Sequence, residues 1–230
     1  MSLYVIADLH LCFCDPSKTM SIFPGWENYQ ERIEQHWREL IKPEDTVVIP
    51  GDISWGMSLQ QAAPDFRFIN ELPGEKIILK GNHDYWWDTK TKIEKFFGKY
   101  GFKTFSVLFN NAYLVDGVAI CGTRGWFYDA HGTQDEKIIN REVGRLKTSI
   151  EAAKKLDGEV IVFLHYPPVF AGKECPEIMN VLLEYDIKKC YYGHLHGKHT
   201  HNLANVGNYK GIEFKLIACD YTQFKPIHVT

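Results

Sequence analysis

The chain has 230 residues, with 26 Lys and Arg against 29 Asp and Glu, and its formal net charge is -3 at pH 7. This length suits one α/β domain with a sizeable core, and no Ser/Gly/Pro-rich stretch or charge block marks a linker, so we predict a single domain over residues 1–230. The absence of a Lys/Arg run argues against a dedicated nucleic-acid-binding surface, and no segment reaches the roughly 18 consecutive apolar residues of a membrane span.

Five apolar runs rich in β-branched and aromatic residues predict strands. Continuous apolar runs of this length are typical of strands that are buried on both faces of a parallel sheet. The five runs cover residues 3–7, 46–49, 76–79, 160–164 and 189–192.

Helices are predicted between these strands, and the first carries an apolar stripe that we expect to be core. The stripe consists of Trp26, Tyr29, Ile33, Trp37 and Leu40, which recur at helical spacing. Later helices are expected from Pro64 after a break near Ala63, from an Asp88 cap through Phe97 to Gly98, and from about residue 134 to 156.

Shorter strands are predicted in the middle and at the end of the chain. Hairpin turns are expected at Asn110-Asn111 and at Asp116-Gly117, and Lys210-Gly211 separates the last two strands. The strands cover residues 103–108, 112–115, 118–121, 203–206 and 212–218. Strands that alternate with helices in this way indicate an α/β fold.

Polar strings directly follow the five apolar runs, and this conjunction is the most informative feature of the sequence. In open α/β sheets, sites form outside the carboxyl ends of the strands, so residues from distant strings can converge. The strings are Asp8-Leu9-His10, Gly51-Asp52, Gly81-Asn82-His83-Asp84, His165 and Gly193-His194-Leu195-His196. Each string alone is weak evidence for a metal site, because a Gly-Asp pair is usually a turn and a single His is usually a hydrogen-bonded core or loop residue. Together, imidazole, carboxylate and amide groups suit manganese, iron or zinc.

The ordered conjunction resembles the calcineurin-like metallophosphoesterase superfamily, whose pattern is Asp-x-His, Gly-Asp, Gly-Asn-His-Asp or Glu, a lone His, and Gly-His-x-His. The resemblance spans residues 8 to 196 and implies two packed mixed β-sheets flanked by helices, a four-layer α-β-β-α sandwich. It also implies two divalent metal ions. One would be held by Asp8, His10, Asp52 and His196, and the other by Asp52, Asn82, His165 and His194, with Asp52 bridging.

The implied activity is hydrolysis of a phosphomonoester or a phosphodiester by metal-bound hydroxide, because two cations can stabilise both the attacking and the leaving oxygens. His83 is not a ligand in this scheme, and we expect it to protonate the leaving group, with Asp84 orienting its ring. Arg124 lies in a Gly-flanked loop and is a candidate for holding phosphate oxygens, with a surface ion pair as the alternative. Arg141 and Arg145 are weaker candidates of the same kind.

Two other functions are compatible with parts of the sequence. One is a catalytically inactive scaffold of the same fold that binds protein partners, although this chain keeps the full ligand set. The other is a structural zinc protein built on His194 to His201, which leaves the upstream strings unexplained. Protein serine/threonine phosphatases have the motif Gly-Asp-x-Val-Asp-Arg-Gly, and this chain departs from it with the segment Gly51-Asp52-Ile53-Ser54-Trp55-Gly56. This departure favours a small phosphoester substrate over a phosphoprotein.

The cysteines and the amino terminus favour the cytoplasm. Six cysteines without a Cys-x-x-Cys pair are typical of reduced thiols, and the first residues lack a basic-then-apolar signal peptide. Cys12 and Cys14 follow His10 closely, so they form either a redox-sensitive rim of the site or an ordinary packed loop. Aromatic residues that follow the ligand strings either wall a substrate pocket or seal the loops, and we favour sealing. They are Trp55, Tyr85, Trp86, Trp87 and Tyr166.

Overall fold

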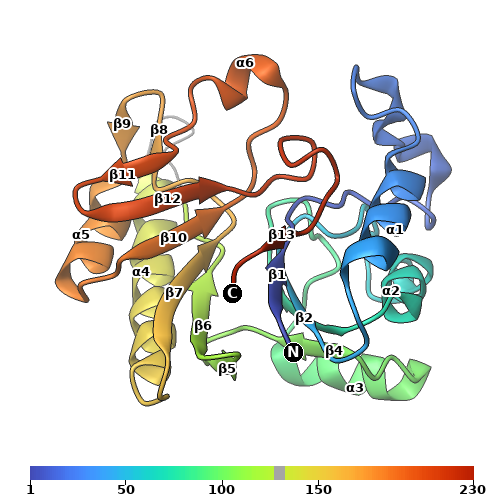
Figure 1. Ribbon diagram of the computed structural model, residues 1–230, viewed down its shortest axis with the longest axis horizontal. Helices are drawn as coiled ribbons and strands as arrows, with labels where there is room; N and C mark the ends of the chain where they lie inside the picture. Colours follow the sequence, from blue (N-terminus) through green and yellow to red (C-terminus); the bar gives the residue numbers. More distant parts are fainter. Residues whose placement is uncertain (127–132) are drawn as a thin grey trace.

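Two large mixed sheets face each other in the computed structural model, which describes residues 1–126 and 133–230, without the side chains of 133–135. The five-stranded sheet has the order β13-β1-β2-β3-β4, and the six-stranded sheet has the order β11-β12-β10-β7-β6-β5 (Figure 1). Neighbouring strands from β1 to β4 are parallel, as are those from β12 to β6, whereas β13, β11 and β5 run antiparallel at the edges.

The strands differ in length, and the longer ones lie inside the sheets. The first sheet contains β1 (Leu3–Val5), β2 (Thr46–Pro50), β3 (Glu75–Leu79), β4 (Phe105–Val107) and β13 (Ile227–His228). The second contains β5 (Tyr113–Val115), β6 (Val118–Thr123), β7 (Glu159–Leu164), β10 (Lys189–Tyr192), β11 (Gly207–Tyr209) and β12 (Ile212–Leu216). A small hairpin consists of β8 (Val169–Phe170) and β9 (Lys173–Glu174).

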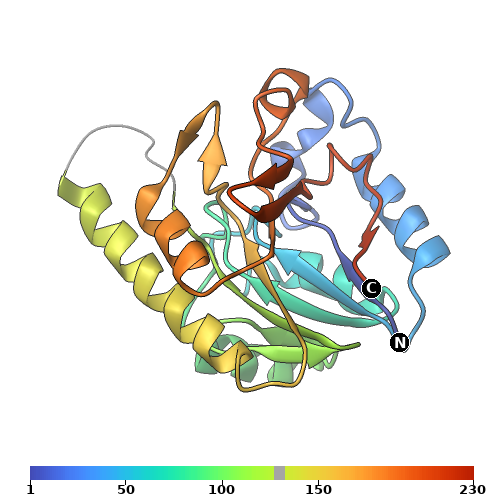
Figure 2. The ribbon, with the colours of Figure 1, turned by 60° about the vertical axis from the view of Figure 1, so that its left-hand side comes forward.

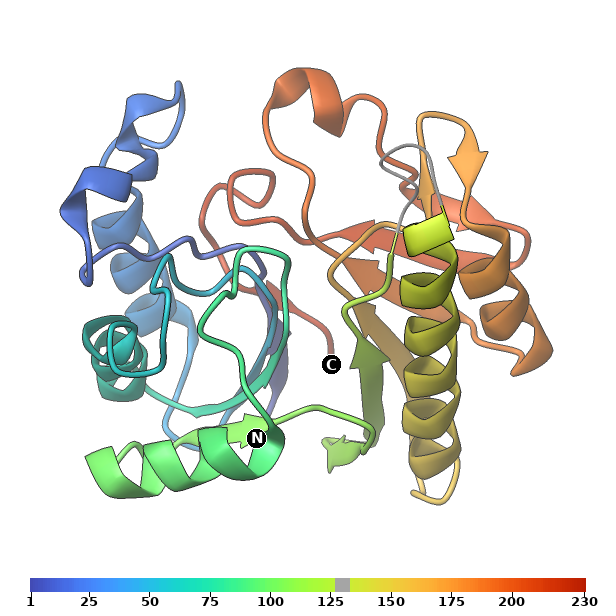
Figure 3. The same ribbon diagram turned by 180° about the vertical axis from the view of Figure 1, so that it is seen from behind.

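Helices cover the outer faces of both sheets. The described helices are α1 (Tyr29–Leu40), α2 (Ala63–Glu71), α3 (Lys90–Tyr100), α4 (Thr133–Ala153), α5 (Pro176–Glu184) and α6 (Lys198–His201), with short 3-10 turns at Pro16–Lys18 and Met20–Ile22. In Figures 1 and 3, α1, α2 and α3 lie outside the first sheet, and α4 and α5 lie outside the second. Figure 2 shows α4 and α5 side by side. The order of layers is therefore helix, sheet, sheet, helix, as expected.

Three apolar clusters separate these layers. Successive side chains of a strand point to opposite faces, so a strand inside a sandwich must be apolar on both. In β2, Val47 and Ile49 pack in the cluster beneath α1 to α3, whereas Val48 packs between the two sheets. In β7, Val162 packs beneath α4 and α5, and Phe163 lies between the sheets. This two-sided burial explains the continuous apolar runs.

The carboxyl ends of the two sheets are hydrogen-bonded to each other. Ala7, just after β1, donates its N–H to the carbonyl of Ile217 at 2.9 Å and accepts from Cys219 N at 3.0 Å. This bridge brings the polar residues that follow β1 beside those that follow β12. No helix among the described residues is long and apolar enough to cross a membrane.

Several predicted elements differ from the observed ones at their ends. Leu40 is 40% exposed, and Ile41 is buried in its place. Thr89 rather than Asp88 caps α3, by accepting from Lys92 N, and the helix continues to Tyr100 before the left-handed Gly101. Both differences are shifts of one to a few residues, where local capping signals overlap.

Two predicted pairings are wrong. Asn110-Asn111 is no hairpin turn, because β4 pairs in parallel with β3 in the first sheet and the chain then crosses to the second sheet. Residues 203–206 form no strand, and the strand that forms a hairpin with β12 around the expected Lys210-Gly211 turn is β11. The hairpin at Asp116-Gly117 is confirmed.

Candidate metal centre

The five polar strings meet where the carboxyl ends of the two sheets come together. Four of the expected ligands have left-handed backbones: φ is 62° at Asp8, 44° at His10, 51° at Asp52 and 72° at His194. Residues other than glycine rarely adopt such angles, and they concentrate at functional sites where the surrounding structure enforces them. The strands therefore end in tight turns that direct these side chains inward.

Glycines let the loops approach one another closely enough to form the site. A Cβ at Gly81 would overlap the carboxylate of Asp52, and a Cβ at Gly193 would overlap the carboxylate of Asp8. The glycine that precedes Asn82 and the glycine that precedes His194 are thus required by the packing of the opposite loop.

The first ligand group consists of Asp8, His10 and His196, whose ligand atoms lie within 4.8 Å of one another. The Nε2 atoms of His10 and His196 are 3.2 Å apart, and His196 Nε2 is 3.8 Å from Asp8 Oδ1. Two ring nitrogens and a carboxylate oxygen that converge on one point are the arrangement of metal ligands.

The second ligand group consists of Asp52, His165 and His194, again within 4.8 Å. Asn82 belongs with them, since its Oδ1 lies 2.6 Å from His165 Nε2 and 2.9 Å from His194 Nδ1. The structure therefore brings together the seven residues expected to bind metal.

Asp52 lies between the two groups. Its Oδ2 is 3.6 Å from His10 Nε2 and 3.5 Å from His165 Nε2, and its Oδ1 accepts the N–H of His83 at 2.7 Å. Asp52 is 1% exposed, so its position is fixed by the surrounding loops. Asp52 is therefore within reach of both ligand groups.

Hydrogen bonds outside the ligand groups orient two of the rings. His165 Nδ1 donates to the carbonyl of Pro50 at 3.1 Å, and His196 Nδ1 donates to Asp220 Oδ1 at 3.0 Å, which leaves Nε2 of each ring as the ligand atom. Asp220 also accepts from Gly197 N at 2.8 Å and lies 3.3 Å from His201 Nε2. Asp220 was missed in the sequence, although it follows an apolar strand just as Asp8 does.

Burial sets the protonation state of the ligands. It lowers the pKa of His165 to about 3 and the pKa of His10 well below its ordinary value, so both rings are neutral, which is the form that binds metal. Burial raises the pKa of Asp8 and of Asp52, and their mutual repulsion adds to the shift at Asp8. Buried carboxylates among neutral imidazoles are stabilised by a cation, so the residues present fit the metal ions implied by the sequence.

His83 lies beside the first ligand group without belonging to it. Its ring centroid is 5.6 Å from that of His10 and 4.6 Å from that of Trp55, and its Nδ1 is buried without a hydrogen-bond partner among the described residues. The ring is thus held by packing, next to the expected metal ligands.

The expectation that Asp84 orients the ring of His83 is wrong. The Asp84 carboxylate accepts the backbone N–H groups of Asp52, Ile53 and Gly81 at 2.7 to 2.9 Å and the indole N–H of Trp86 at 2.9 Å. Burial and the charge of Asp52 raise the pKa of Asp84 to about 7. Asp84 therefore positions the Asp52 loop, because its oxygens face backbone amides instead of the imidazole.

Aromatic residues near the ligands mostly pack, as favoured from the sequence. Trp55 stacks on the ring of His10 at 5.0 Å between centroids, Tyr166 contacts His194 at 4.3 Å, and Trp86 is 2% exposed. Tyr85 is 54% exposed.

The cysteine loop after His10 is packed. Tyr29 Oη donates to the carbonyl of His10 at 2.7 Å and lies 3.3 Å from Cys12 Sγ. Burial raises the pKa of the Cys14 thiol to about 12, which opposes formation of a reactive thiolate. The packed-loop interpretation of Cys12 and Cys14 is the one these contacts favour.

Arg124 is mostly buried beside the second ligand group. Its carbonyl accepts from His165 N at 3.1 Å and from Tyr166 N at 2.9 Å, and its Nη2 lies 3.9 Å from Glu142 Oε1. The ion pair weighed as an alternative is therefore present, but it is long and involves a buried carboxylate.

A family model described as calcineurin-like phosphoesterase matches residues 1–198. A search of curated proteins found no match.

Solved structures share the fold at low sequence identity. A phosphopantetheinyl hydrolase from Mycobacterium tuberculosis superposes with a TM-score of 0.56 at 12% identity, covering 99% of this chain and 95% of that chain. A protein from Thermus thermophilus gives 0.57 at 11% identity over 99% and 97% of the two chains. A protein of unknown function from Aquifex aeolicus gives 0.52 at 16% identity over 99% and 95%.

The family match includes each of the polar strings through His196, and the fold brings their side chains together in two groups that could hold metal ions. The chain therefore belongs to the calcineurin-like phosphoesterase family and is a metal-dependent phosphoric ester hydrolase.

Proposed function

We propose that this protein hydrolyses a small phosphomonoester or phosphodiester at a centre of two divalent cations. The position of Asp52 between the two ligand groups carries the proposal, since its Oδ2 lies about equally far from His10 and from His165. When bound, the cations supply positive charge that stabilises the attacking and leaving oxygens of the phosphoryl group. Manganese, iron and zinc all suit the mixed imidazole, carboxylate and amide ligands.

The surrounding residues would orient the ester and supply a proton. His83 is a non-ligand imidazole beside the first ligand group, and its position supports the role of general acid toward the leaving oxygen. Asp84 supports catalysis indirectly, by holding the loop that carries Asp52. Arg124 would contact an anionic part of the substrate.

The scaffold hypothesis is the second candidate, and the complete ligand set disfavours it. A protein that only binds partners has no need for seven converged ligands, with the pKa values of their carboxylates raised by burial. A phosphoprotein substrate is disfavoured by the departure at Gly51 to Gly56 described above.

We propose that residues 1–230 form one metallophosphoesterase domain, and that the protein works in the cytoplasm. The six cysteines are free, which supports a reducing compartment. We further propose that the protein acts on a small phosphoester. It would bind neither nucleic acid, through a dedicated surface, nor a membrane.

The experiment that tests the function combines metal analysis with two assays. We expect about two metal ions per chain, and turnover of p-nitrophenyl phosphate, bis-p-nitrophenyl phosphate or both that increases with added Mn²⁺ and disappears with a chelator. Asp52→Asn should lose both metal and turnover, whereas Asp186→Asn, at an exposed position, should keep both. Full metal occupancy without turnover of any phosphoester would instead support the scaffold.

A further inference from the structure

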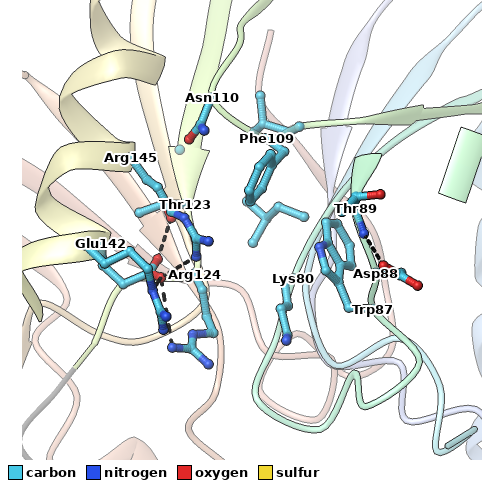
Figure 4. A pocket seen from close by; sticks show the side chains of 14 residues that line it. Lys80, Trp87, Asp88, Thr89, Phe109, Asn110, Thr123, Arg124, Glu142 and Arg145 are labelled. Carbon is cyan, nitrogen blue, oxygen red and sulfur yellow. Dashed lines mark hydrogen bonds and ion pairs between the residues drawn. The ribbon is translucent and has the colours of Figure 1, made fainter. Parts of the chain in front are cut away.

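A pocket of about 390 Å³ lies between the two sheets, next to the second ligand group (Figure 4). One wall consists of α4 and the end of β6, with Thr123, Glu142 and Arg145. The other wall is the chain after β3, with Lys80 and Trp87. The expected metal ligands are not among the lining residues, so this pocket is separate from the metal centre.

The α4 wall carries more positive charge than its one carboxylate can neutralise. Glu142 is fully buried, accepts from Thr123 Oγ1 at 2.6 Å and forms a 2.7 Å ion pair with Arg145. The guanidinium groups of Arg124 and Arg141 lie farther away, each with one nitrogen at 3.9 Å from Glu142 Oε1. Among the side chains that the structure describes here, three cations therefore share one carboxylate, which leaves an excess of two positive charges.

Lys80 adds a further cation from the opposite wall. In Figure 4, the ends of Lys80 and Arg124 lie at the same end of the pocket, on facing walls. Lys80 itself is half-buried. Arg124 Nε is buried and has no hydrogen-bond partner among the described residues. Partly desolvated cations that face each other, with only one distant carboxylate near Arg124, are stabilised by a bound anion.

The end of the pocket that carries Lys80 and Arg124 lies next to the candidate metal centre, because backbone segments connect the two. Lys80 precedes Gly81 and Asn82, and the carbonyl of Arg124 accepts from His165 N at 3.1 Å. Asn82 and His165 are both members of the second ligand group. A small molecule could therefore have one phosphate at the metal centre and another anionic group in this pocket.

We propose that the pocket is a second anion site, and that the substrate is a small phosphoester that carries a second phosphate group away from the one that is hydrolysed. This rests on the proposed function and narrows its substrate class. Trp87 and Phe109 also line the pocket and add aromatic surface beside the cations. Asp88, the other acidic lining residue, is already paired with Lys92 at 3.0 Å.

The test uses pairs of non-hydrolysable ligands that differ only in the second anion. Alkylphosphonates and the matching α,ω-alkane bisphosphonates, with spacers of two to eight carbons, are titrated calorimetrically into the Mn²⁺-loaded protein, with a blank into the same Mn²⁺ buffer. At the best spacer length, we expect the bisphosphonate to bind at least tenfold more tightly than its alkylphosphonate. A ratio below two at every length would overturn the proposal.

Substitutions in the pocket test whether the second phosphonate group binds at Lys80 and Arg124. Lys80→Met keeps most of the aliphatic stem and should lower the affinity ratio at least fivefold, as should Arg124→Met. The matched control is Lys189→Met, at the amino end of β10, where Lys189 pairs with Glu159, and it should keep the wild-type ratio. A high ratio that both pocket variants retain would place the second anion elsewhere and also overturn the proposal.

Turnover measured on the same samples separates this inference from the proposed function. A protein that hydrolyses p-nitrophenyl phosphate but shows no preference for bisphosphonates has the proposed activity without the second anion site. Near-ultraviolet circular dichroism of each variant shows whether it is folded, so that a lower bisphosphonate-to-alkylphosphonate affinity ratio can be assigned to the missing cation. Lys80→Gln provides a second neutral substitution if Lys80→Met does not fold.

Discussion

Asp220 accepts a hydrogen bond of 3.0 Å from Nδ1 of His196, a residue of the first ligand group. The hydrogen bond fixes the tautomer whose Nε2 faces His10 and Asp8. Burial lowers the pKa of His196, but the bond to Asp220 and the charge of Asp8 outweigh burial and raise it. The ring of His196 and the carboxylate of Asp220 are therefore coupled to the first ligand group.

Removing this carboxylate should weaken metal binding without removing a ligand. Asp220→Ala is expected to lower Mn²⁺ affinity by about 10- to 100-fold, because partners of metal-bound histidines contribute about that much. Asp220→Asn should lose less, since its carbonyl oxygen can still accept from Nδ1. Isothermal titration with Mn²⁺ measures both, and Asp186→Asn, at an exposed position, is the control. Equal affinity in wild type and Asp220→Ala would contradict the role given to Asp220.

A methyl group at Gly81 should disrupt the centre, because it would overlap the carboxylate of Asp52. Gly81→Ala is expected to lose metal and turnover and to lower the free energy of unfolding by about 1–3 kcal/mol, as for other overpacked sites. Gly98→Ala is the matched control, because a Cβ there meets nothing within 4 Å and Gly98 lies inside α3. It should stabilise the protein by up to about 1 kcal/mol. Urea unfolding and metal analysis of both variants check this, and retention of metal by Gly81→Ala would contradict it.

His83 should affect turnover more than metal content. His83→Ala is expected to lower kcat by about 10²- to 10⁴-fold with an alkyl ester, whose leaving oxygen needs a proton, and by less with a p-nitrophenyl ester. Steady-state kinetics on the two esters and elemental analysis of the same samples measure these effects. His199→Ala, at an exposed histidine, should change neither. Equal losses with both esters, or loss of metal, would indicate that His83 is not the acid.

Lys76 should make stability depend on pH in the alkaline range. Its side chain is fully buried in β3, and burial lowers the pKa from 10.5 to about 8. Between pH 8 and 10.5 the folded state has lost a proton that the unfolded state still binds, so the free energy of unfolding rises with pH, by at most about 3 kcal/mol. Below pH 8 both states are protonated, and this contribution is absent.

The measurement compares urea unfolding of wild type and Lys76→Met at pH 7 and pH 10, with a chelator present. From pH 7 to pH 10, the free energy of unfolding of wild type should increase relative to that of Lys76→Met. Lys95→Met, at an exposed lysine of α3, reports changes common to all lysine substitutions. A constant difference between wild type and Lys76→Met across this range would show that Lys76 does not titrate as described.

The sequence by itself determined the buried strands and the order of the polar strings that follow them. Two-sided burial leaves a local mark, because Val47, Val48 and Ile49 must all be apolar when both faces of β2 are covered. Parallel strands deliver their carboxyl ends to one edge, so Asp8, Asp52 and His165 were predicted to meet although they are far apart in the chain.

The tertiary structure decided which groups those side chains contact, because such partners depend on loops that meet only after folding. Asp84 was assigned to the neighbouring His83, but the loop after β2 presents its amides to Asp84. Likewise, β4 joined the first sheet, because pairing along an edge is a long-range choice that the turn residues Asn110-Asn111 do not specify. The excess of cations around Glu142 and Lys80 arises from two sheets, and no local pattern in the sequence brings them together.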